Sequence, residues 1–245
     1  GVPVSETHES GSPVVGVITR TDLLALRDLR AGDPRTAGDV MTEGVIAVRA
    51  ETPLSEVAGT MVAERVHRVF VVDGERLAGV ITPHELIRAV VDARHAAPIS
   101  EFVTSPVLAI LPDTTLGKAL EHLDETGVSG LVVVEEEWPI GVFTQREALA
   151  YRNLPGDTPL EGLYSPGLVC LARHTPLHRA CTQALAARVK RILAMDGGEV
   201  DGIVSGLAVA RAIASADGAG PRRCATRYAG APDGAAVAAL AGWLQ

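Results

Sequence analysis

One phrase recurs four times along the chain: VVGVITRTDLL at 14–24, LAGVITPHELI at 77–87, PIGVFTQREAL at 139–149 and VDGIVSGLAVA at 200–210. Each copy contains an apolar stretch, a glycine, a second apolar stretch, a Thr or Ser, and then a helical pattern. The four glycines are 63, 62 and 61 residues apart. A repeat of this length indicates duplicated small domains rather than a thin solenoid.

The second repeat shows the order of elements in its front half. A helical turn is expected near 39–41, followed by a short apolar strand at 45–48. Thr52 suits a helix N-cap and Pro53 suits the first helical turn, so a helix is expected from there. The apolar stripe that follows has helical spacing.

The back half of the same repeat reads as a hairpin and a helix. Strands are predicted at 69–72 and 77–81, and the Asp-Gly pair at 73–74 between them is a strong hairpin signal. A second helix is expected from Thr82 to about Asp92. The predicted fold class is therefore α/β (α+β), built from repeated β-α-β-β-α units.

Such units of roughly 60 residues bury little surface alone, so we expect them to associate in pairs. The expected domains are the back half of repeat one at 1–30, repeat two at 36–95, repeat three at 97–153, repeat four at 158–215, a linker at 216–230 and a C-terminal helix at 231–245.

Three features resemble a known family. The opening DVMTEGVIAV at 39–48, the strand HRVFVVD at 67–73 and the GVIT-x-x-D/E turn are similar to CBS (cystathionine-β-synthase) domains, over about 1–214. The resemblance implies that two repeats associate through their sheets into a Bateman module. It also implies that adenosine ligands such as AMP, ADP, ATP or S-adenosylmethionine bind in the clefts between paired repeats.

The two ends of the chain look complementary. Residues 1–5 match the first hairpin strand of a repeat, and the tail APDGAAVAALAGWLQ at 231–245 resembles LPDTTLGKALEHLDE at 111–125. The tail could complete repeat one in the same chain, complete it in a partner chain, or reflect a residue order that differs from the gene. Alternatively, it is an Ala-rich helix that packs elsewhere. We expect a helix over 235–244 that packs against 1–29.

The turn after the glycine supplies candidate ligand groups. It reads TRTD at 19–22, TPHE at 82–85, TQRE at 144–147 and SGLA at 205–208. In the family this turn places a hydroxyl near a phosphate and a carboxylate on the ribose hydroxyls. A carboxylate suits a diol because each oxygen can accept a hydrogen bond. The same spacing is also a helix capping box, so the acids of repeats two and three are open to that interpretation.

Basic residues open two of the hairpin strands. HRVFVVD in repeat two is similar to the basic phrase of the γ subunit of AMP-activated protein kinase, where such residues face nucleotide phosphates, and KRILAMD at 190–196 matches it in repeat four. Arg binds phosphate well because its fork donates two parallel bonds. A solvated strand end is the alternative. The candidate ligand-binding residues are Thr19, Arg20, Asp22, His67, Arg68, Thr82, Glu85, Thr144, Glu147, Lys190, Arg191 and Ser205.

Composition limits the other function classes. The net charge is −8, which argues against a general nucleic-acid partner. No apolar run approaches the ~18 residues of a membrane helix, and three cysteines without a CxxC pair suggest a reduced, cytoplasmic protein. No catalytic or metal-ligand motif is evident, so we expect no enzyme activity, no metal and no required cofactor.

The sequence favours a regulatory protein that senses an adenine nucleotide or related adenosyl ligand, most fully in the pair of repeats one and two. A homodimer and an unidentified regulated protein are the expected partners, with neither nucleic acid nor membrane. The alternative is a structural or oligomerisation module with degenerate sites. A catalytic domain that precedes Gly1 is a further possibility, because the chain starts within a repeat.

Overall fold

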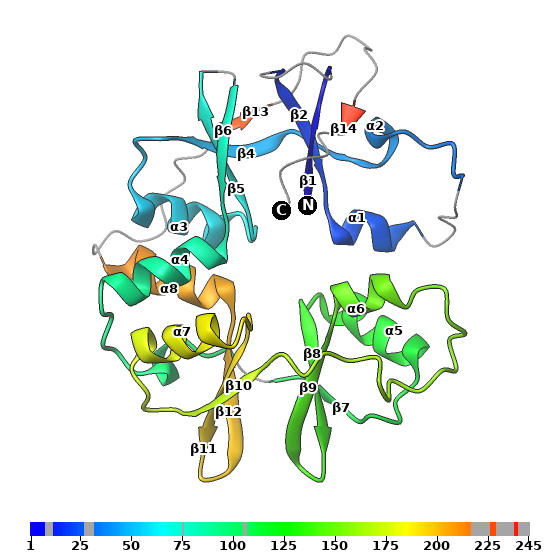
Figure 1. The fold of residues 1–245 in the computed structure, drawn as a ribbon, viewed down its shortest axis with the longest axis vertical. Helices are drawn as coiled ribbons and strands as arrows, with labels where there is room; N and C mark the ends of the chain where they lie inside the picture. Colours follow the sequence, from blue (N-terminus) through cyan, green and yellow to red (C-terminus); the bar gives the residue numbers. More distant parts are fainter. Residues whose placement is uncertain are drawn as a thin grey trace. The chain divides into compact units, whose positions relative to one another are not determined.

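The chain forms two compact units in the computed structural model (Figure 1), which describes residues 1–7, 12–26, 32–74, 76–104, 107–216, 226–228 and 238–239. The first unit comprises Gly1–Pro83 with Ile213–Gln245, and the second comprises His84–Ala212.

The first unit contains repeat one and most of repeat two. Its elements are β1 (Val2–Ser5), β2 (Val14–Ile18), α1 (Arg20–Ala25), α2 (Ala37–Val40), β3 (Thr42–Glu43), β4 (Val45–Arg49), α3 (Leu54–Ala63), β5 (Val69–Asp73), β6 (Arg76–Ile81), β13 (Thr226–Tyr228) and β14 (Ala238–Ala239). They build two sheets, in the orders β14-β1-β2-β3 and β13-β4-β5-β6.

The two sheets of the first unit share one apolar core. Val14 on β2 packs with Val45 and Ala47 on β4 and with Phe70 and Val72 on β5. All five side chains are buried. Because this cluster joins strands from both repeats, repeats one and two pair through their sheets.

The second unit contains repeats three and four and the last helix of repeat two. Its elements are α4 (Pro83–Asp92), the 3₁₀ turn η1 (Ile99–Glu101), β7 (Ala109–Ile110), α5 (Leu116–Thr126), β8 (Gly130–Glu135), β9 (Trp138–Thr144), α6 (Gln145–Ala150), β10 (Val169–Ala172), α7 (Leu177–Ala186), β11 (Ile192–Asp196), β12 (Glu199–Val204) and α8 (Gly206–Ala216), whose last residues belong to the first unit.

The second unit has two three-stranded sheets, which match the arrangement of β4-β5-β6 in the first unit. Its sheets run β7-β8-β9 and β10-β11-β12, each with a parallel first pair and an antiparallel hairpin. Val132 and Val142 of repeat three pack with Leu193 of repeat four, and Ile203 and Met195 flank them. The predicted fold of paired β-α-β-β-α units is confirmed.

Local predictions hold with small shifts at the element ends. The hairpin predicted in repeat two is β5–β6, and the second helix is α4. The expected N-cap at Thr52 is wrong, because Pro53 occupies the cap position and makes no side-chain capping bond. Proline has a fixed φ that suits a helix entrance, so the chain enters α3 without a hydroxyl cap.

The tail differs from the predicted helix where the structure describes it. Ala238 and Ala239 form β14, which pairs antiparallel with β1, so the expectation of a helix is wrong at these two residues. The pairing does place this part of the tail against repeat one of the same chain. The other residues of the predicted helix, 235–237 and 240–244, lie outside the described part.

Three short segments, which we call lead-ins, cross from one repeat to the other within a pair. They are residues 41–43, 103–104 and 164–165, each just before the first strand of a repeat. The first pairs with β2, the second bridges Ile203 on β12, and the third bridges Val142 on β9. Each lead-in therefore extends the hairpin of its partner repeat.

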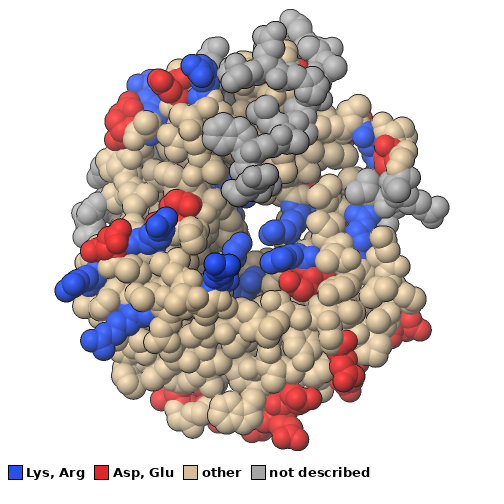
Figure 2. Space-filling model, in the orientation of Figure 1, with Lys and Arg blue, Asp and Glu red and all other residues tan. Residues whose placement is uncertain are grey.

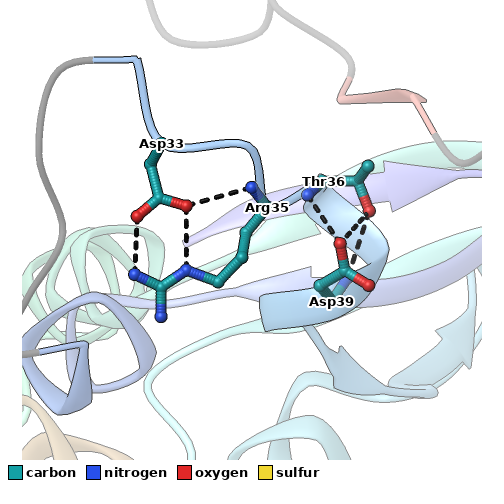
Figure 3. Close-up of polar contacts among 4 residues, drawn as sticks. All are labelled: Asp33, Arg35, Thr36 and Asp39. Atoms are coloured by element: carbon teal, nitrogen blue, oxygen red, sulfur yellow. Dashed lines mark hydrogen bonds and ion pairs between the residues drawn. The ribbon is translucent and has the colours of Figure 1, made fainter.

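The approach to the first lead-in is fixed by two acidic side chains (Figure 3). The Asp33 carboxylate accepts from Arg35 Nε at 2.9 Å and from Arg35 Nη2 at 2.6 Å. Asp39 Oδ2 accepts from the Thr36 amide at 2.7 Å, and the two residues form the capping box of α2. This local network orients the chain as it enters β3.

Within the described ranges, no helix is long and apolar enough to cross a membrane.

Candidate functional site

The turn between β2 and α1 brings Thr19 and Asp22 together. Asp22 Oδ2 accepts from the Thr19 amide at 2.6 Å and from Thr19 Oγ1 at 2.7 Å, and the Asp22 amide donates back to Thr19 Oγ1 at 3.4 Å. This is a complete capping box, as the T-x-x-D spacing allows. The turn therefore holds its carboxylate in a fixed orientation.

The other Asp22 oxygen faces the lead-in of repeat two. Thr42 Oγ1 donates to Asp22 Oδ1 at 3.1 Å. A carboxylate oxygen can accept two bonds, so Oδ1 keeps capacity for a further donor. The candidate ribose anchor of repeat one is thus linked to the partner repeat by a single exposed hydroxyl.

Two arginines lie near each other in the same unit. Arg68 is half-buried before β5, and its Nη1 donates to the backbone carbonyl of Gly1, before β1. Burial lowers the pKa of Arg68, and the positive charge of Arg20 lowers it further. Among the residues described, neither arginine has an ion pair with a carboxylate. The site therefore concentrates unneutralised positive charge.

The second unit repeats this arrangement with one change. Arg191 Nη2 donates to the Ser129 carbonyl at 2.8 Å and to Ser129 Oγ at 3.2 Å, at the entrance to β8. Burial lowers the pKa of Arg191, while the negative charge of Glu147 opposes that shift. Glu147 also accepts from the Thr144 amide at 3.1 Å in a capping box. Here an acid faces the arginine.

The remaining candidates are distributed over the other turns and strand entrances. Thr82 follows β6 and is half-buried, and Glu85 lies exposed in the first turn of α4. His67 and Lys190 are exposed beside the two arginines. In repeat four, Ser205 Oγ accepts from the Ala208 amide at 3.4 Å. Ala208 has no carboxylate, so this turn has a cap hydroxyl and no ribose anchor.

Sequence reasoning did not select Thr42, Gly1 or Ser129. Thr42 lies in the recognised phrase DVMTEG, but its contact with Asp22 arises only when the lead-in crosses to repeat one. Gly1 and Ser129 take part through their backbone carbonyls, which any residue supplies. An alignment of the four hairpins is the signal that points to these contacts. In it, Gly1 of repeat one and Gly130 of repeat three occupy the position that Arg68 and Arg191 occupy in repeats two and four.

Acidic charge gathers away from these turns. Figure 2 shows acidic side chains over the tip of the β8–β9 hairpin. Glu135, Glu136 and Glu137 are exposed there, and the last two have positive φ values of 47° and 70°. They form a solvated turn.

These features define a protein of tandem CBS domains. Residues 37–92 and 99–153, which are repeats two and three, match the family model of the CBS domain. Repeats one and four have the same hairpin and turn, and each packs its sheet against one of the matched repeats. Residues 37–92 and 99–153 are therefore CBS domains.

Known proteins are similar over different parts of the chain. A solved structure of a protein from Methanocaldococcus jannaschii, described as a proposed archaeal homologue of g-AMPK, is similar with a TM-score of 0.70 at 18% identity. The match covers 83% of this chain and 85% of that protein's chain. An uncharacterised conserved protein of Pyrococcus horikoshii is similar with a TM-score of 0.62 at 18% identity, and the match covers 82% of this chain and 86% of that one. These likenesses establish the fold.

One curated relative is much longer than the matched segment. The A-adding tRNA nucleotidyltransferase of Geobacter sulfurreducens is 26% identical over 133 residues, which are 54% of this chain and 15% of that protein. The chain thus corresponds to a small part of that relative.

Proposed function

We propose that this chain is a regulatory protein that senses an adenine nucleotide, and that the nucleotide binds in the first unit. The observation that carries this proposal is the position of Arg68: burial lowers its pKa, and the neighbouring positive charge of Arg20 lowers it further. A bound phosphate would neutralise this repulsion and accept the bidentate bonds that arginine offers.

Asp22 supplies the second half of the proposed site. The capping box holds its carboxylate at the start of α1, and Oδ1 has capacity for another donor. A ribose diol would donate to this carboxylate and take the place of the Thr42 hydroxyl. AMP, ADP and ATP all offer a diol and a phosphate in one molecule.

Charge separates the candidate ligands. The sulfonium of S-adenosylmethionine is positive and would be repelled by two arginines, whereas a phosphate would be attracted. We therefore favour phosphorylated adenine ligands over S-adenosylmethionine at this site.

The Thr42 contact suggests how binding would be read out. Thr42 lies on β3, which pairs with β2 of repeat one. A ligand that displaces its hydroxyl from Asp22 would alter the lead-in, and through it the pairing of the two repeats. Such a differential contact is what a ligand needs in order to shift a conformational equilibrium. A regulated protein, a homodimer and the lack of catalysis belong to the same proposal.

Titration calorimetry on the full chain tests the proposal. Parent protein is expected to bind AMP more tightly than adenosine. Asp22→Ala should weaken AMP binding about ten- to a hundredfold, because hydrogen bonds to a charged group are lost. Glu147→Ala is the matched control, since it removes the equivalent acid in the second unit. Retained affinity in Asp22→Ala with loss in Glu147→Ala would move the site to the second unit.

A structural module is the second candidate function. Its support is that the Asp22 carboxylate already serves as a helix cap and that Ala208 stands where repeat four needs an acid. If the parent binds no adenine ligand at millimolar concentration, this function replaces nucleotide sensing.

A further inference from the structure

Three of the four repeat glycines lie beneath a lead-in. A Cβ on Gly16 would lie 2.7 Å from the carbonyl oxygen of Thr42. A Cβ on Gly141 would lie 2.7 Å from the Ser165 carbonyl oxygen, and one on Gly202 would lie 3.2 Å from that of Thr104. Each glycine is therefore required by the close approach of another strand.

The lead-ins share a simple chemistry. A bulky residue covers the glycine, namely Met41, Tyr164 or Val103. The next residue is Thr or Ser, and it pairs with the residue after the glycine. In repeat three, the Val142 amide donates to the Ser165 carbonyl at 2.7 Å, and the Ser165 amide donates back at 2.9 Å.

Gly79 on β6 is the fourth position and differs from the others. A Cβ there would meet no described atom within 4 Å. Val80, which follows it, is 43% exposed, whereas its counterpart Val142 is 4% exposed. Strand β6 ends its sheet, so nothing described pairs with its outer side.

The hairpin register shows which groups this edge offers. Val80 pairs with Phe70 as Val142 pairs with Val132. The Val142 amide points outward to its lead-in, so the Val80 amide and carbonyl point outward as well. An exposed edge with free backbone groups and an apolar side chain is a template for strand addition.

We propose that the Gly79 edge of β6 is a docking site for an extended strand of a partner protein. The occupant has the chemistry of the three lead-ins: a bulky apolar or aromatic side chain covers Gly79, and a following Thr or Ser pairs with Val80. The three filled positions of the same chain carry this assignment, since they show what the geometry accepts. The proposal does not depend on nucleotide binding.

Disulfide trapping tests the register of the docked strand. The probe is a synthetic copy of residues 160–168 with cysteine at the position of Ser165, and the protein is Val80→Cys in a Cys170→Ser, Cys181→Ala, Cys224→Ser background. Paired positions in an antiparallel ladder lie ~5.5 Å apart at Cα, within disulfide reach. In a thiol exchange buffer we expect at least about tenfold more peptide adduct than with Arg76→Cys, an exposed site on the same strand.

A second peptide and a second readout complete the test. A peptide with glycine at the Tyr164 position should lose most of the adduct, because nothing would cover Gly79. In the unaltered protein, saturating peptide should slow exchange of the Val80 amide about tenfold or more. Equal adduct at Val80→Cys and Arg76→Cys overturns the proposal. A Val80→Cys homodimer that excludes the peptide also overturns it, because the occupant would then be a second copy.

Discussion

The two units pair their repeats in the same way, and in each unit one arginine reaches from one repeat to the other. The charged residue next to that arginine is basic in the first unit and acidic in the second. Arg68, before the hairpin of repeat two, donates to the Gly1 carbonyl of repeat one, and Arg191, before the hairpin of repeat four, donates to the Ser129 carbonyl of repeat three. Repeats one and three each have a glycine, Gly1 or Gly130, at the position of that arginine. A Cβ on Gly1 or Gly130 would lie 2.9 Å from a guanidinium nitrogen. The glycine thus makes room for the arginine.

The charge beside that arginine separates the units. Arg20 adds positive charge beside Arg68 in the first unit, and Glu147 adds negative charge beside Arg191 in the second. Both turns keep an acid at their fourth position, and they differ at the second position, where repeat one has Arg20 and repeat three has Gln145. The two units can therefore differ in ligand capacity although their repeats pair in the same way.

The largest expected effect is on nucleotide affinity. Arg68→Ala should weaken AMP binding about ten- to a hundredfold while leaving adenosine binding within about threefold, because only AMP has a phosphate. Arg191→Ala is the matched control and should leave AMP affinity within about threefold. Calorimetric titration of both variants measures these values. Equal losses in the two variants would mean that the charge difference does not select the ligand.

A pair of glycine substitutions compares a covered strand with an open one. Gly16→Ala should destabilise the protein by about 1–3 kcal/mol, because its Cβ would press on the Thr42 carbonyl. Gly79→Ala should be neutral or stabilise by up to about 1 kcal/mol, since it meets no described atom and restricts the unfolded chain. Urea denaturation of both variants measures the difference. A similar loss at Gly79 would show that this edge is already covered.

A substitution in the second unit should make it resemble the first. Gln145→Arg places a base where repeat one has Arg20 and keeps Glu147 as the acid of the turn. With the first site silenced by Asp22→Ala, AMP affinity of the second unit should rise about tenfold, or ~1.4 kcal/mol. The control is Gln145→Met, which keeps the length of the side chain without the charge. No gain in calorimetric titration of Gln145→Arg would indicate that charge alone does not make the site.

Much of the architecture was predictable from local patterns. The hairpins around Gly79 and Gly141 and the helices after Thr82 and Thr144 follow from apolar alternation, turn residues and caps, which act over a few residues. Pairing through sheets followed from the small size of each unit. Asp22 and Arg68 were chosen from motifs, and the structure places both in the first unit.

The contacts across each pair were not predictable from the sequence. The Thr42–Asp22 bond joins residues 20 positions apart, and the Arg68–Gly1 bond joins residues 67 apart. Both depend on how two repeats pack. The tail misled us because its alanines favour a helix, while the open edge of β1 offers backbone partners to Ala238 and Ala239. Tertiary pairing outweighed local propensity there.

The lead-in regions of the two units differ in how they are fixed. Before β3, the Arg35 side chain and amide lower the pKa of Asp33 to about 2, and bonds from Thr36 lower the pKa of Asp39. The corresponding region of repeat four is held by backbone bonds, such as Leu160 N to Thr114 O at 2.9 Å. Carboxylates titrate and backbone amides do not.

Acid should therefore loosen the lead-in of the first unit before that of the second, which is the smallest effect we predict. The folded pKa of Asp33 lies below its ordinary value of 3.8, so its contacts contribute stability above pH 3.8 and lose it as the pH falls through about 2. The carboxylate is exposed, so the contribution is small and screened by salt. Carbon-detected NMR should give an Asp33 midpoint near 2. Over the same range, the protection factor of the amide, which is corrected for the intrinsic pH dependence of exchange, should fall at Met41 and stay unchanged at Leu160. An Asp33 midpoint near 3.8, or an equal fall in protection at both amides, would show that the carboxylates do not fix this lead-in.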